Sequence, residues 1–332
     1  MQKFLSIIVS AFLLTIIFSA FSWATVPLTA LAVEFSSTGS NSSGPATQVP
    51  EEVYSDQILW EGEKNRITLV GQENISRERI RTPEVMILIP AGGYLAGGDP
   101  KTGYKECVKH AQSCELEWFE HEGPTSWVWI EKFYLDIYEV TQIDFEKVMG
   151  KNPSKYKGDN LPVERVLWNE AREYCEKIGK RLPTEAEWEK AAKGGGNTLY
   201  PWGNEVVSGM ANFCDVNCKA YFKAEQFDDG FKGTAPVGSY PPNGYGLYDM
   251  AGNVWEWVSD WYGAGYYKER PQRNPQGPFN EQDLFHIHGM KKVLRGGSWG
   301  NNAGAMRSST RSWAHNSRVS RRGFRCALDT TS

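Results

Sequence analysis

The chain has 332 residues, with 36 Lys and Arg against 40 Asp and Glu, so its formal net charge is −4. That balance argues against a nucleic-acid-binding protein, which would carry a basic surplus. Charged residues at 23% and aromatic residues at 13% exclude a disordered chain.

The N-terminal residues have the pattern of a secretory signal. Lys3 supplies a positive charge, an uncharged and mostly apolar run extends from Phe4 to Phe21, and Ser22-Trp23-Ala24 follows. Small residues at the −3 and −1 positions predict cleavage after Ala24. An uncleaved membrane anchor is the alternative, because the run is nearly long enough to span a bilayer. In either case we expect the rest of the chain to be exported, as a periplasmic or secreted protein.

All 6 cysteines lie in the part that we expect to be exported, where an oxidising environment favours disulfides. Six cysteines allow 15 pairings. Zinc is the competing interpretation of the Cys-x-x-x-Cys pair, but no His or further cysteine pair stands near it in the sequence. Spacing favours two local bridges and one long-range bridge, namely Cys107–Cys114, Cys214–Cys218 and Cys175–Cys326.

A polar region separates the signal, residues 1–24, from the folded domain. Within residues 25–83, the segment 36–50 is rich in Ser, Gly and Pro and predicts a flexible linker, whereas the remainder has no clear pattern. The domain is expected over residues 84–330, and it opens with a short apolar strand at Met86–Pro90. The Gly-rich stretch Ala91–Gly98 lacks the Gly-Lys-Ser/Thr of a phosphate-binding loop, so a turn is predicted there.

Capping residues and glycine stops predict three helices. Thr184 and Glu187 have capping-box spacing, in which each side chain accepts the other residue's backbone N–H. Beyond Gly196 the helical period disappears, and aromatic segments such as Trp255–Val258 and Val293–Leu294 predict strands. The fold class is therefore α+β with a loop-rich second half. The predicted helices are Gln142–Met149 after Thr141, Glu170–Ile178 after Asn169, and a helix from Thr184 to Lys193.

Several motifs occur in a fixed order along this domain. Taken together, they resemble the formylglycine-generating enzyme family, whose domain is also called the sulfatase-modifying factor domain. The resemblance implies a variant of the C-type-lectin fold with little regular secondary structure. The motifs are Met86–Pro90, Glu139–Thr141, Lys180–Glu189, Tyr200–Gly203, Asp229–Phe231, Asn243–Trp257, Arg295–Trp299 and Gly323–Cys326.

The resemblance also implies two structural calcium sites. Carboxylate and carbonyl oxygens are the ligands that Ca²⁺ takes, and such a site can hold a loop that has no helix or sheet bonds. Solvated turn residues are the alternative interpretation. The implied ligands are Asn212, the Phe213 carbonyl, Asp229 and the Phe231 carbonyl in one site, and Asp249, the Gly252 and Val254 carbonyls and Glu256 in the other.

The sequence departs from the family at the catalytic positions. Active members oxidise a substrate cysteine with copper held by two cysteines after the Gly-Gly-Ser motif. Counted from Ser298, these positions are Asn301 and Met306, and neither can form the thiolate that selects Cu(I). A further cysteine pair found in some members falls on Ala192 and Arg311, and it is absent as well. Copper chemistry of the known kind is therefore not expected.

Two other patterns offer weaker chemistry. His286 and His288, with Met306, could form a different metal site, although two solvated histidines are the simpler interpretation. Gly296–Gly300 matches the Gly-x-Ser-x-Gly nucleophile pattern, but a triad would need an Asp between Ser298 and the following His315, and there is none. Ser298 is better interpreted as the family's serine in the substrate groove.

A basic segment stands out in this acidic chain. Residues 284–328 contain no Asp or Glu and nine cations: Lys291, Lys292, Arg295, Arg307, Arg311, Arg318, Arg321, Arg322 and Arg325. Arg295 and Arg325 belong to family motifs and are expected to pair with buried acids or stack on Trp. We assign ligand binding to Arg307, Arg311, Arg318 and Arg321, for an anion such as a carboxylate, sulfate or phosphate. The Gly-, Asn- and Ser-rich residues 300–320 also resemble the variable surface of lectin-fold proteins diversified by retroelements.

These observations favour an exported binding or accessory module, stabilised by calcium and disulfides. Its groove would use Trp255, Ser298, Asn301 and Met306 beside the arginines, for a peptide, a glycan or a small anion. No nucleic-acid partner is expected, and the membrane would be contacted only through an uncleaved N-terminal segment. The alternatives are a cysteine-independent periplasmic oxidase of the siderophore-maturation type and, with less support, a sulfatase activator that generates formylglycine.

Overall fold

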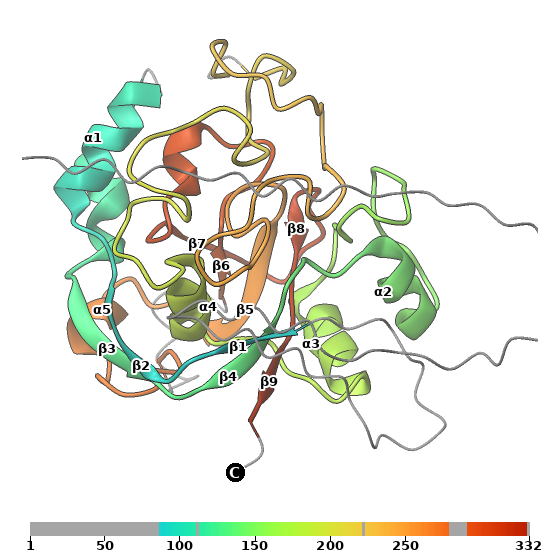
Figure 1. The fold of residues 1–332 in the computed structure, drawn as a ribbon, viewed down its shortest axis with the longest axis horizontal. Coiled ribbons are helices and arrows are strands. Elements are labelled where there is room, and N and C mark those ends of the chain that lie inside the picture. Colours follow the sequence, from blue (N-terminus) through green and yellow to red (C-terminus); the bar gives the residue numbers. More distant parts are fainter. Residues whose placement is uncertain (1–85, 111–112, 221–222, 279–290, 331–332) are drawn as a thin grey trace, which may run out of the picture. The chain divides into compact units, whose positions relative to one another are not determined.

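The computed structural model describes residues 86–110, 113–220, 223–278 and 291–330 (Figure 1). Three sheets are formed within these residues, and all strand pairs are antiparallel except β5 with β8. The sheets are β1 (Met86–Ile89), β4 (Phe133–Asp136) and β9 (Ala327–Asp329) in the order β1-β4-β9; β2 (Gly92–Ala96) with β3 (Ser126–Ile130); and β7 (Arg311–Ala314), β6 (Lys292–Arg295), β5 (Trp255–Trp261) and β8 (Arg322–Gly323) in the order β7-β6-β5-β8.

Short helices surround and divide these sheets. They are α1 (Pro100–His110), α2 (Gln142–Met149), α3 (Trp168–Lys177), α4 (Glu185–Ala192) and α5 (Tyr266–Glu269), with 3₁₀ turns at Leu116–Glu122 and Ala303–Met306. Between α4 and β5 the described residues form only turns and isolated bridges. The prediction of an α+β fold with a loop-rich second half is therefore confirmed. Among the helices described, none is long and apolar enough to cross a membrane.

Two of the three predicted helices begin as expected. The Thr141 hydroxyl accepts the Asp144 N–H at 3.3 Å, and Gly150 ends α2 in the left-handed conformation with φ 69°. At α4 both halves of the capping box are present: the Glu187 N–H donates to the Thr184 hydroxyl at 3.1 Å, and the Thr184 N–H donates to the Glu187 carboxylate at 2.8 Å. Local hydrogen bonding thus determines where these helices start.

Two expectations were wrong. Asn169 does not cap α3, which begins at Trp168; the Glu170 carboxylate accepts the N–H of the preceding Leu167 at 3.0 Å instead. The Gly-rich stretch after Pro90 is not a turn, because Gly92–Ala96 forms β2 and pairs with β3. The register places Gly92 opposite Ile130 and Ala96 opposite Ser126.

The centre of the domain is α4, in which every residue is buried. Figure 1 shows it beside β5 and β6, and it also contacts β2 and β3. Lys190 in this helix and Lys193, directly after it, both contact backbone oxygens. The Lys190 ammonium donates to the Gly92 carbonyl at 3.0 Å, and the Lys193 ammonium donates to the Leu95 carbonyl at 2.6 Å. Because the short β2–β3 ribbon exposes carbonyls toward α4, these lysines attach the ribbon to the core.

The three predicted disulfides are confirmed, and the chain has no free cysteine. The Cys107–Cys114 and Cys214–Cys218 bridges close local loops, whereas Cys175–Cys326 spans 151 residues. The long bridge joins α3 to the residue before β9, and both of its cysteines are fully buried. In the chain-entropy model, the effect of a disulfide on the unfolded chain grows with loop length.

We expect the double substitution of Cys175 and Cys326 by Ser to lower the free energy of unfolding by about 5 kcal/mol, against about 2–3 kcal/mol for Cys107 and Cys114. Urea unfolding of the two double variants, followed by Trp fluorescence, measures both values. Equal losses would show that loop closure is not the main contribution of the long bridge.

Candidate ligand-binding site

The turn after β6 brings together three of the predicted groove residues. Gly296 and Gly297 have φ values of 92° and 77°, and they turn the chain so that Ser298 is fully buried. The Ser298 hydroxyl donates to Oδ1 of Asn301 at 2.6 Å, and the Trp255 indole N–H donates to the same oxygen at 2.9 Å. Two donors on Oδ1 fix the orientation of the amide, and Nδ2 of Asn301 has no hydrogen-bond partner within the described ranges, so its two N–H groups can serve a ligand.

A cavity of about 100 Å³ opens beside this amide. Two neighbouring arginines contribute to it. Arg321 donates to the Gly300 carbonyl at 3.1 Å, and Arg322 donates to the Ser317 carbonyl at 3.1 Å. Within the described part of the chain, neither arginine forms an ion pair with a carboxylate. The lining residues are Trp255, Leu294, Asn301, Ser312, Trp313, Val319, Arg321 and Arg322.

The two arginines also act on each other. Burial and the charge of Arg321 lower the pKa of Arg322 from its ordinary value. Arg321 has a φ of 109°, which is unfavourable for a residue with a side chain, and its carbonyl accepts the Trp255 N–H at 2.7 Å. Strain of this kind occurs at binding sites where the surrounding structure holds it in place. An anion in the cavity would relieve the repulsion between the two guanidinium groups.

Two arginines that the sequence assigns to ligand binding are part of the core, and this corrects the expectation. Arg307 binds both oxygens of Glu122, at 2.6 and 2.8 Å. Arg311 binds both oxygens of Glu185, at 2.7 and 2.9 Å. Both arginine side chains are almost fully buried, so their donors are used within the chain.

Of the other arginines in the basic segment, three pair with a glutamate and one belongs to the cavity. Arg318 pairs with Glu170 at 2.5 Å and keeps 36% of its side chain exposed. Arg295 pairs with Glu189 at 3.1 Å, and Arg325 pairs with Glu256 at 2.8 Å, as expected for family-motif residues that pair with buried acids. Arg322, which the sequence analysis did not assign to the site, belongs to it. Among the arginines of this segment, Arg321 and Arg322 are distinguished by having no carboxylate partner in the described part of the chain.

Met306, the second position of the missing copper pair, does not line the cavity with Asn301. It is 1% exposed and packs in an apolar cluster with Tyr200 and Phe213. It also lies directly under Gly297, where a Cβ would be 2.4 Å from the Met306 methyl group. The expectation that Met306 contributes to the groove was therefore wrong, and its role is packing.

The remaining sequence patterns add no catalytic group. The Ser298 hydroxyl is bonded to an amide oxygen, and no described histidine bonds to it. His315 is exposed and lies edge-on to Trp313, with ring centroids 6.0 Å apart. His286 and His288 lie outside the described residues. Within the described ranges, no three His, Cys, Asp or Glu side chains gather where they could hold a metal ion.

The implied calcium ligands differ in how they are engaged. Oδ1 of Asn212 and Oδ1 of Asp249 are buried and have no hydrogen-bond partner among the described residues, which suits oxygens that bind a cation. The Asp229 carboxylate accepts the Phe213 N–H at 3.0 Å and the Phe231 N–H at 2.9 Å. Glu256 is less available, because both of its oxygens accept from Arg325, and one also accepts the Trp188 indole N–H at 2.8 Å.

Comparison with known proteins identifies the family. Residues 71–330 match the family model of the sulfatase-modifying factor enzyme 1-like domain. The chain is 32% identical over 301 residues to the mouse formylglycine-generating enzyme, covering 74% of this chain and 75% of that protein. It is 30% identical over 307 residues to the mouse protein named inactive C-alpha-formylglycine-generating enzyme 2, covering 73% and 85%.

Two solved structures are also similar. Treponema denticola variable protein 1 aligns with a TM-score of 0.59 and 25% identity, covering 74% of this chain and 95% of that one. PvdO from Pseudomonas aeruginosa aligns with a TM-score of 0.57 and 26% identity, covering 74% and 94%. The chain therefore belongs to the formylglycine-generating enzyme family and has its loop-rich variant of the C-type-lectin fold.

Because Arg307 and Glu122 form a buried pair, we expect Arg307→Ala to lower the free energy of unfolding by about 3–5 kcal/mol, since an unpaired carboxylate remains in the core. Arg172→Ala is the matched control, because it removes an exposed i,i+4 pair worth about 0.5 kcal/mol. Urea unfolding at neutral pH compares the two variants. If Arg307→Ala leaves the free energy of unfolding unchanged, the buried pair is not needed for stability, and a role of Arg307 in ligand binding would be open again.

Proposed function

We propose that this member of the family is an exported binding or accessory module, which holds an anionic group of its ligand between Arg321, Arg322 and the amide of Asn301. The observation that carries the proposal is the pair of arginines without a carboxylate partner at one cavity, beside an oriented amide donor. Charge-assisted hydrogen bonds from guanidinium groups are strong when the partner is a carboxylate, sulfate or phosphate. Of the ligand classes open from the sequence, a small anion or an acidic peptide group suits this cavity best.

Thiol-based copper chemistry has no support in this chain. Counted from Ser298, Asn301 and Met306 stand where the resemblance places the two copper ligands, and every cysteine is in a disulfide. The similarity to a relative that is named inactive is in line with a role outside formylglycine formation. The test is direct: a sulfatase co-expressed with this protein in copper-replete, aerobic medium should keep its substrate cysteine, as judged by mass spectrometry of the peptide.

A cysteine-independent oxidase of the siderophore-maturation type is the second candidate that the family resemblance leaves open, and PvdO is the solved structure to compare with it. Such an enzyme would consume oxygen with a substrate bound in the same cavity. Removing a side chain such as Arg321 would then lower the rate as well as the affinity. A binding module would show saturable binding without oxygen consumption.

Export of the chain is supported by three disulfides and the absence of a free thiol, in agreement with the predicted signal.

Calcium binding is the second part of the proposal. Asn212 and Asp229, with the Phe213 and Phe231 carbonyls, would hold one ion. Asp249 would hold the other ion, together with the Gly252 and Val254 carbonyls. Glu256 would join this site only by giving up hydrogen bonds from Arg325 and Trp188. The support is the pair of buried, unpartnered oxygens on Asn212 and Asp249.

We expect Arg321→Ala to weaken the binding of succinate or sulfate by about 10-fold or more, because one charge-assisted interaction contributes about 1.5–3 kcal/mol. Arg318→Ala is the control, since Arg318 lies in the same segment but already pairs with Glu170. Isothermal titration calorimetry at low salt gives both affinities. Equal effects of the two variants, or no binding to the unchanged protein, would contradict an anion site in this cavity.

Calcium should raise the melting temperature of the mature, chelator-treated protein. At a calcium concentration about 100-fold above Kd, the expected stabilisation is about 2.7 kcal/mol for each site. Asp249→Asn should remove the contribution of one site, whereas Asp159→Asn, at an exposed position, should leave the response unchanged. Identical melting curves in calcium and in EGTA would show that these oxygens do not bind the ion.

A further inference from the structure

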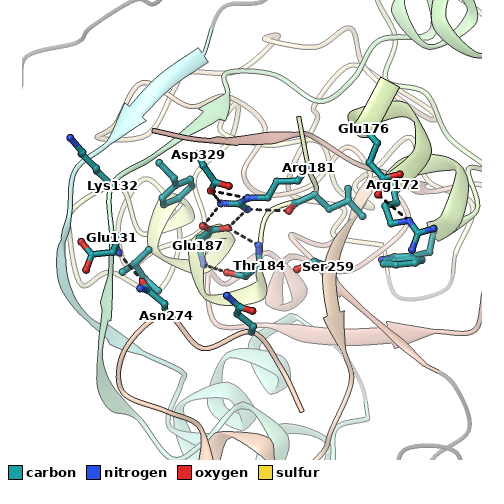
Figure 2. A pocket seen from close by; sticks show the side chains of 15 residues that line it. Glu131, Lys132, Arg172, Glu176, Arg181, Thr184, Glu187, Ser259, Asn274 and Asp329 are labelled. Atoms are coloured by element: carbon teal, nitrogen blue, oxygen red, sulfur yellow. Dashed lines mark hydrogen bonds and ion pairs between the residues drawn. The ribbon is translucent and has the colours of Figure 1, made fainter. Parts of the chain in front are cut away.

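A second and larger cavity lies at the β3–β4 connection, α3 and β9, and its lining does not include the Asn301 site. Its volume is about 590 Å³, within the range of small-molecule sites. Figure 2 shows Arg181, Glu187 and Asp329 at its centre, with Glu131 and Asn274 on one side and Arg172 on the other. Gln276 and Ser259 also line it. No part of the family resemblance assigns a function to this cavity.

Most charged side chains of the lining form ion pairs, although three cations stand against four carboxylates and Lys132 has no ion pair among the described residues. Arg181 donates to both oxygens of Glu187 at 2.7 Å, and its Nε and Nη2 donate to Oδ1 of Asp329 at 3.0 and 2.6 Å. Its remaining bond goes to the Leu182 carbonyl at 3.2 Å. At the rim, Arg172 pairs with Glu176 at 3.4 Å. The guanidinium that dominates the centre therefore has no donor left for an anionic ligand.

What remains open is a set of neutral donors and acceptors. Asn274 uses Oδ1 to accept the Glu131 N–H at 2.9 Å, and its Nδ2 has no partner among the described residues. The exposed Gln276 amide likewise has none within the described part of the chain. Asp329 keeps Oδ2, and the hydrogen bond from Arg181 lowers its pKa, so this oxygen is an acceptor at neutral pH. The set includes donors and acceptors, which suits hydroxyl groups because each hydroxyl can donate and accept.

One aromatic group stands next to these polar ones. Trp168 is partly exposed and lines the cavity, and its indole N–H is held by the Val258 carbonyl at 2.8 Å. The Lys292 ammonium and the Arg172 guanidinium lie over its ring, 3.8 and 5.2 Å from the ring centroid. Ile130, Phe133 and Leu182 also belong to the lining, but each is no more than 2% exposed. A sugar ring presents C–H groups on its faces and hydroxyls at its edge, so a fixed indole at one wall and oriented polar groups can contact both parts.

We propose that this cavity binds an uncharged oligosaccharide, through Asn274, Gln276 and Asp329 at its polar edge and Trp168 at its wall. The site is separate from the anion cavity, and it would give an exported module a second kind of ligand. A neutral ligand is also in line with the pairing of Arg181 with two carboxylates of the lining, which leaves this guanidinium no donor for an anion. The Arg321 site shows the opposite arrangement, since its two arginines have no carboxylate partner among the described residues.

The test is titration calorimetry of the full mature protein with five neutral hexasaccharides: maltohexaose, cellohexaose, laminarihexaose, mannohexaose and chitohexaose. We expect saturable binding of at least one. Gln276→Ala should weaken it at least 5-fold, and Asn274→Asp should do so too, because Asp keeps the acceptor for the Glu131 N–H and removes the Nδ2 donor. Neither change is expected to disturb folding, since Gln276 is exposed and Asp tolerates the φ of 44° at position 274.

The controls separate this proposal from the anion site and from other surfaces. Gln226→Ala changes an exposed glutamine outside the cavity, and Arg321→Ala empties the other site; both should leave the sugar affinity unchanged. Raising the salt from about 0.05 to about 0.5 M should have little effect, because no charge is bound. Three results would overturn the proposal: no binding with Kd below about 10 mM, full affinity in both cavity variants, or loss of affinity only in Trp127→Ala, which changes a Trp that is 66% exposed elsewhere on β3.

Discussion

The domain depends on one constraint: α4 places the carboxylates of Glu185 and Glu189 in the interior, and a buried carboxylate requires positive partners. Arg311 and Arg295 provide them from β7 and β6. Burial alone would favour the neutral acids, yet these arginines hold the pKa of Glu185 below its ordinary value. Since the pairs connect α4 to two strands of the largest sheet, the position of the helix and that of the sheet are set together.

The same constraint determines what is left for binding. The sequence alone predicts a cationic surface for the basic segment. In the structure, five of its arginines form ion pairs with glutamates from other parts of the chain. Only the positions without such a partner, among the described residues, keep their charge for a ligand. The candidate ligand-binding arginines are therefore identified by elimination. They are the arginines that form no ion pair with a carboxylate among the described residues.

Local features were predictable from the sequence, and long-range partners were not. The capping box at Thr184 is encoded in four consecutive residues, and the replaced copper positions follow from a count beginning at Ser298. By contrast, the partner of Arg307 lies 185 residues away, at Glu122, and no periodicity reveals it. The strand at Gly92–Ala96 was missed for a similar reason, since its stability comes from β3 and from α4 rather than from its own residues. The oligosaccharide cavity is assembled from several distant segments, so no single motif indicates it.

The order in which the domain can be completed follows from residues 322–329. β8 adds the parallel edge of the β7-β6-β5-β8 sheet, and β9 closes the sheet of β1 and β4. Between them, Arg325 binds Glu256, and Cys326 reaches Cys175 across 151 residues. A growing chain therefore cannot finish its core segment by segment as it emerges. β4, β5 and α3 lack their partners until these eight positions have been made, so we expect a chain that ends before residue 322 to stay incompletely folded and open to proteolysis.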